Sequence, residues 1–77
     1  MSNLEGYLRD LGWLLKQEAL GVKSEYSNAS ADDVAYCEGK LFAYYEVLSL
    51  MLSQAAAFQI ESAALGLDGF SPDRELI

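Results

Sequence analysis

The chain has 77 residues, a length that forms one domain and buries only a modest fraction of its surface without a disulfide, a metal or a partner chain. It contains one cysteine and no histidine, which excludes an internal disulfide and the usual zinc ligand sets. Apolar residues make up 52% of the chain, too many for a disordered acidic segment. We therefore expect a single folded domain over residues 1–77, with no metal and no cofactor, that gains burial from a partner chain.

The net charge of −7 would repel phosphate backbones and anionic membrane surfaces, so we expect no direct binding of nucleic acid. The first residues lack the basic and apolar blocks of a secretory signal, which predicts a cytoplasmic protein. Residues 41–60 hold a single charge, Glu46, and are long enough to cross a bilayer. The polar Glu46, Gln54 and Gln59 argue against a span, so a small single-span membrane protein is kept as an alternative.

A first helix is predicted to begin at Ser2, because Ser2 and Glu5 have the spacing of a capping box. It should run to about Tyr26. Its apolar residues recur at steps of three, four and seven, as one helix face requires, and they are Leu4, Leu8, Leu11, Leu15 and Val22.

The small polar stretch 27–30 predicts a turn, and Ser30 is expected to cap a second helix that starts at Ala31. This helix has the cleaner pattern, with steps of three and four that are typical of a helix-packing seam. The seam residues are Val34, Cys37, Leu41, Tyr44, Leu48, Met51, Ala55 and Phe58. The helix could continue to Leu65 and stop at Gly66, or break near Ile60.

Near the end of the chain, Ser71 followed by Pro72 predicts a capped short turn of helix. Two long helices joined by a short turn must lie antiparallel. The predicted fold is thus all-α: an antiparallel two-helix hairpin with a short C-terminal helical turn, which dimerises into a four-helix bundle.

The dimer is predicted because the second helix is also apolar on the side opposite its seam, which one partner helix cannot cover. The expected dimer interface comprises Ala43, Val47, Leu50, Met51 and Ala57. A groove for a different protein is the alternative interpretation of the same side.

Trp13 and Leu20 lie seven residues apart on the back of the first helix, so they form one strip. Because Trp often dominates binding energy, this strip is the candidate site for a protein partner. The alternative is that the strip is covered, either by Leu65, Leu67 and Phe70 or by the second copy of a dimer.

The remaining polar and aromatic residues are interpreted as structural. We expect Glu46 to pair with Arg9, and Glu38 to pair with Lys16 or Lys23. The three tyrosines of the second helix should belong to the seam, with their hydroxyls at its rim; they are Tyr36, Tyr44 and Tyr45.

No nucleophile with a base, phosphate loop or ligand cluster is present, so we expect no enzyme and no catalytic residue. The predicted function is that of a small acidic interaction protein, a regulator or adaptor, that acts as a homo-oligomer on an unidentified protein partner. A second hypothesis is an acidic inhibitor or nucleic-acid mimic that binds a basic protein through residues such as Asp32 and Asp33.

Overall fold

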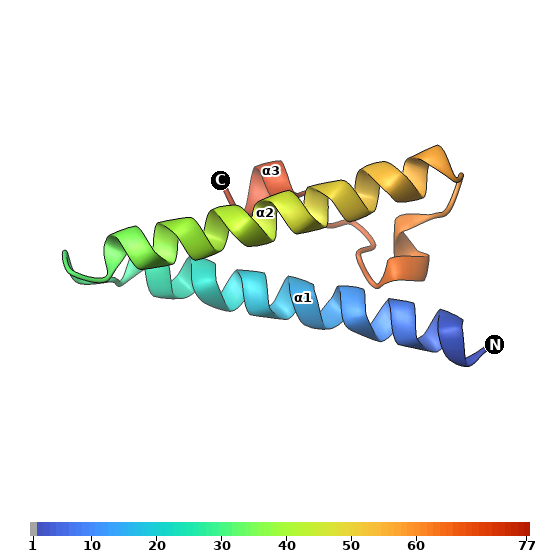
Figure 1. The fold of residues 1–77 in the computed structure, drawn as a ribbon, viewed down its shortest axis with the longest axis horizontal. Coiled ribbons are helices and arrows are strands. Elements are labelled where there is room, and N and C mark those ends of the chain that lie inside the picture. Colours follow the sequence, from blue (N-terminus) through green and yellow to red (C-terminus); the bar gives the residue numbers. More distant parts are fainter. Residues whose placement is uncertain (1) are drawn as a thin grey trace.

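The computed structural model describes residues 2–77, and every regular element in this range is a helix. Two long helices, α1 (Asn3–Ser27) and α2 (Val34–Ala57), run antiparallel and diverge away from their connecting turn (Figure 1). The chain then forms a short 3-10 helix, η1 (Ser62–Leu65), and a four-residue helix, α3 (Pro72–Glu75). The predicted hairpin with a short C-terminal helical turn is therefore confirmed.

The start of α1 is the predicted capping box. The backbone N–H of Glu5 donates to the Ser2 hydroxyl at 3.1 Å, and the Ser2 N–H donates to the Glu5 carboxylate at 3.3 Å. These two bonds satisfy donors that the first helical turn leaves unpaired. The signal is local in sequence, which explains why the boundary was predicted correctly.

The start of α2 differs from the prediction, because the helix begins at Val34 instead of Ala31. The Ser30 hydroxyl donates to the Asp33 carboxylate at 3.2 Å and does not cap the helix. The Ser30 carbonyl accepts from the N–H groups of Asp33 and Val34, which closes a tight turn over residues 31–33. The acidic side chains thus belong to the turn rather than to the first turn of the helix.

The end of α2 settles the open alternative in favour of a break before Ile60. The helix stops at Ala57, and Gln59 takes the left-handed conformation with φ 58°. The Ile60 N–H then donates to the Ala55 carbonyl at 2.7 Å, a bond that satisfies one of the last helical carbonyls. Continuation of the helix to Leu65 is wrong, because the chain reverses at this point.

Residues 60–77, here called the tail, cover one side of the hairpin (Figure 1). The Ser71 hydroxyl accepts from the Arg74 N–H and Pro72 opens α3, so the predicted short helix is confirmed. Leu67 and Leu76 are fully buried in the same core as Leu48. The tail therefore supplies a third layer to a core that two helices alone could not close.

The predicted seam of α2 is buried in its central part. Cys37, Leu41, Leu48 and Ala55 are buried and Tyr44 and Met51 are half-buried, whereas Val34 and Phe58 at the two ends are exposed. Val34 is exposed because it lies beside the connecting turn, and Phe58 is exposed because α1 and α2 diverge at that end.

The predicted stripe of α1 was wrong in its first half, since Leu4, Leu8 and Leu11 are exposed. The residues that α1 buries are Gly12, Ala19 and Val22. The reason is η1, which is packed between the divergent ends of α1 and α2 and contacts α1 at Gly12. Because η1 lies between the two helices here, the leucines of the first half of α1 do not pack closely against α2.

The expected ion pairs of Glu46 with Arg9 and of Glu38 with a lysine do not form; within residues 2–77 the one ion pair is Arg74–Glu75 at 3.8 Å. Two tyrosine hydroxyls bind carboxylates instead. Tyr26 donates to Glu38 at 3.2 Å, and Tyr45 donates to Asp73 of α3. The first bond links α1 to α2, and the second holds the tail on α2.

These bonds predict a loss of stability at high pH. The hydrogen bond to Asp73, and then the charge of that carboxylate, raise the pKa of Tyr45 above its usual value of about 10. A raised pKa in the folded state means that the contribution to stability is present below about pH 10 and is lost as pH rises through the folded pKa. We expect the unfolding free energy of Tyr45→Phe to fall less steeply above pH 10 than that of the parent. Chemical denaturation across this range, with Tyr36→Phe as the exposed control, measures the difference; equal slopes for parent and Tyr45→Phe would contradict it.

Candidate functional site

The side of the hairpin away from the tail is an apolar surface made by both helices, here called the open face. Two grooves show that α1 and α2 share it: Leu15 lines one with Ala43 and Val47, and Leu8 lines the other with Met51. The open face consists of Leu8, Leu11 and Leu15 of α1 and Ala43, Val47, Leu50 and Met51 of α2.

Helix geometry explains why the tail leaves this face uncovered. Residues two positions apart in an α-helix point to nearly opposite sides. Tyr45 binds Asp73 of the tail, so Ala43 and Val47 point away from the tail. Val47 is 45% exposed and Leu50 is 66% exposed, which is a large exposure for apolar side chains.

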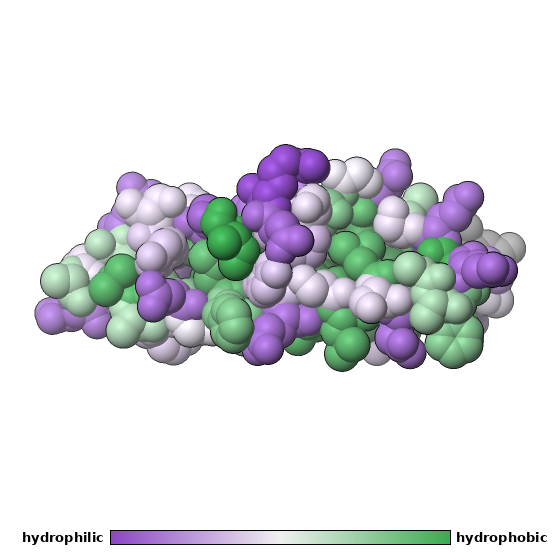
Figure 2. Space-filling view, turned by 90° about the horizontal axis from the view of Figure 1, so that it is seen from above, coloured by the Kyte–Doolittle hydropathy of each residue, from purple (hydrophilic) through white to green (hydrophobic). Residues whose placement is uncertain are grey.

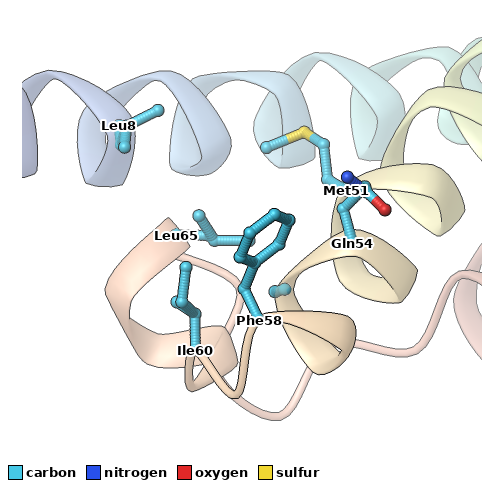
Figure 3. A pocket seen from close by; sticks show the side chains of 7 residues that line it. Leu8, Met51, Gln54, Phe58, Ile60 and Leu65 are labelled. Carbon is cyan, nitrogen blue, oxygen red and sulfur yellow. The ribbon is translucent and has the colours of Figure 1, made fainter.

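A pocket of about 300 Å³ lies where the two helices diverge. Figure 3 shows Phe58 and Leu65 pointing into the gap toward Leu8 and Met51. Phe58 is 70% exposed, and apart from Gln54 the pocket has apolar walls. The open face therefore has a hollow at its wide end, with a large aromatic side chain available beside it.

The total surface is larger than a monomer of this mass should expose. Folded monomers of 8.5 kDa expose about 4,700 Å², whereas this chain exposes 5275 Å². Figure 2 shows the most hydrophilic atoms gathered over α3 and apolar areas on either side of it. The surplus of roughly 600 Å² approaches the ~800 Å² that each partner buries in a standard interface.

The predicted partner strip of Trp13 and Leu20 is divided by the tail. Leu20 is half-buried against the core that includes the tail leucines, and Trp13 remains 48% exposed. The backbone of Gly66 passes against Trp13. Neither residue belongs to the open face. The two also differ in exposure, because the tail covers Leu20 more than Trp13.

Four of the five residues of α2 that were predicted to form a dimer interface lie on the open face, which also includes residues of α1. Ala43, Val47, Leu50 and Met51 lie on the open face, and Ala57 is exposed at the end of the same helix. Leu8 and Leu11, which were predicted to belong to one apolar face of the first helix, are exposed on the open face. The leucine pattern of α1 gave no signal of this, because Leu4, Leu8, Leu11 and Leu15 fall within about 60° of one another around the helix, a stripe that one neighbouring helix can cover.

The acidic residues of the turn are exposed, including Asp32 and Asp33, which the inhibitor hypothesis would use. Within residues 2–77, no group of three His, Cys, Asp or Glu side chains could hold a metal ion. In the same range, none of the helices has the length and apolar content needed to cross a membrane. No protein-family model, curated protein or solved structure matches the chain.

Proposed function

We propose that the chain is a non-catalytic protein–protein interaction protein whose working unit is a homodimer, formed by packing the open faces of two copies together. The observation that carries the proposal is the apolar open face, which runs over both helices and is exposed; the tail contributes Ile60 and Leu65 to the pocket at its wide end. Apolar patches of this extent mark interaction sites in small proteins. The product would be a four-helix bundle with the two tails on its outer sides.

A second copy fits this face better than an unrelated protein because of its area and its shape. The whole chain exposes roughly 600 Å² more than a monomer of its mass, an excess to which its elongated shape of 45 × 22 × 16 Å contributes, and a stable dimer would bury a comparable area per chain. Two antiparallel helices present the geometry that four-helix bundles repeat in each half. Trp13, on another side of α1, stays free in such a dimer and remains the candidate contact for a further partner.

A charge placed on the open face tests the proposal. In Val47→Glu, a carboxylate would enter the apolar interface twice per dimer, and an unpaired buried charge is strongly unfavourable. We expect dissociation to a helical monomer, with a dimer constant weakened by about 100-fold or more. Molar mass from light scattering over a concentration series measures it.

The matched control is Ala56→Glu, an exposed position on the same helix that lies about 180° from Val47 and so points away from the open face. Ala56→Glu should dimerise as the parent does. A parent that stays monomeric at all concentrations, or two variants that dissociate equally, would refute the proposed interface.

A further inference from the structure

We propose that the two copies stack with their turns at the same end, so that α1 of each copy lies on α2 of the other. This inference rests on the proposed homodimer and specifies its partner contacts. A two-fold axis within the interface allows two arrangements of stacked hairpins. If the axis runs along the helices, α1 meets the partner's α2; if it runs across them, each helix meets its own copy and the turns lie at opposite ends.

The distribution of apolar residues along α1 favours the first arrangement. In the first half of α1 the exposed residues of this side are Leu4, Leu8 and Leu11, whereas in the second half Val22 on the same stripe is buried and the exposed residues beside it are Glu18 and Glu25. If α1 packed on its own copy in the opposite direction, the leucines of one copy would face the carboxylates of the other. That contact would remove water from charged groups without giving them a partner.

The partner's α2 offers the matching pattern. Because the hairpin is antiparallel, the first half of α1 is level with the end of α2, as the pocket shared by Leu8 and Phe58 shows. With the turns at the same end, Phe58 lies on the partner's Leu4 and Leu8. The pockets of the two copies then face each other across the interface, and the exposed ring of Phe58 at the edge of each contacts the partner's apolar side chains.

The charges of the open side agree with this arrangement. Lys40 of α2 lines the groove that contains Leu15, and Glu18 follows Leu15 by one helical turn. In the proposed stack, Lys40 faces the partner's Glu18 and the contact occurs twice. In the reversed stack, Glu18 lies near the partner's Glu18, which is repulsive.

One interaction opposes the proposal. The exposed Asp32 and Asp33 of the two turns lie at the same end of the dimer and repel each other. They project from the tip of the turn into solvent, where salt screens charges beyond a Debye length of about 8 Å at physiological ionic strength. Salt does not weaken the apolar contacts between the helices of the two copies, so these contacts determine the arrangement.

Distances between spin labels distinguish the two stacks. The labels are attached to Ala31→Cys at the turn or Glu61→Cys at the wide end, each in a Cys37→Ala background whose helix content is checked by circular dichroism. We expect both label pairs to lie within about 25 Å, because packed helices are 8–10 Å apart. The reversed stack places each pair at about the 45 Å length of the hairpin. Long distances would overturn the proposed stack and leave the dimer intact, whereas the absence of any defined distance would refute the dimer itself.

A charge exchange tests the same contact with Cys37 unchanged. Lys40→Glu should weaken dimerisation roughly tenfold, since two attractive contacts become repulsive. Adding Glu18→Lys should restore the parent's dimer constant. A double variant that dimerises no better than Lys40→Glu would contradict the placement of Lys40 on the partner's Glu18.

Discussion

Gly12→Ala is expected to destabilise the protein by about 3 kcal/mol or more, although alanine is the better helix former. A Cβ at position 12 would overlap the backbone carbonyl of Leu65, and a backbone atom cannot move aside as a flexible side chain can. The variant can fold only if η1 moves off α1. Because η1 is continuous with Leu67, this movement also disturbs the core. Thermal and chemical denaturation at one protein concentration measure the loss.

Gly21→Ala is the matched control on the same helix. A Cβ at Gly21 meets nothing within 4 Å, so the substitution should stabilise the protein by roughly 0.5–1 kcal/mol through helix propensity alone. The two glycines are therefore expected to respond with opposite signs. If both alanine variants were stabilised, the close approach of η1 to α1 would be wrong.

The sequence was sufficient for the elements whose signals are local. The capping box at Ser2 and the Pro72 helix each depend on a few neighbouring residues, and the heptad of α2 identified its central buried side chains. The end of α2 was left open between Leu65 and a break near Ile60, and the structure decided it. The α2 part of the open face also followed from helix geometry alone. These features need no knowledge of what packs on the helices.

The features that sequence analysis missed depend on contacts between distant segments. Nothing in the sequence around Gly12 indicates that it is the contact of α1 with η1. The periodicity of α1 showed that one of its faces is apolar, but periodicity does not show which segment covers a face. The tail packs on the side of α1 that carries Trp13 and Leu20, which was the predicted partner site. The leucines of the first half of α1 therefore stay exposed on the open face.

Leu48→Ala and Leu50→Ala separate the core from the proposed interface by substituting the same residue type two positions apart on α2. Leu48 is completely buried, so its truncation leaves a cavity and should cost about 3 kcal/mol at every protein concentration. For a domain of this size, that loss lowers the melting temperature by roughly 12–24 °C.

Leu50→Ala should instead have an effect that depends on concentration. Leu50 is 66% exposed in one chain, so dilute monomeric protein should change by no more than about 0.5 kcal/mol. At concentrations where the dimer forms, each chain loses an apolar contact worth roughly 1–2 kcal/mol, because dimerisation contributes to the measured stability. Melting temperatures of the parent and both variants over a thousandfold range of concentration provide the measurement. The parent and Leu48→Ala should rise in parallel with concentration, whereas Leu50→Ala should rise less. A Leu50→Ala curve parallel to that of the parent would mean that the open face does not hold a second copy at Leu50.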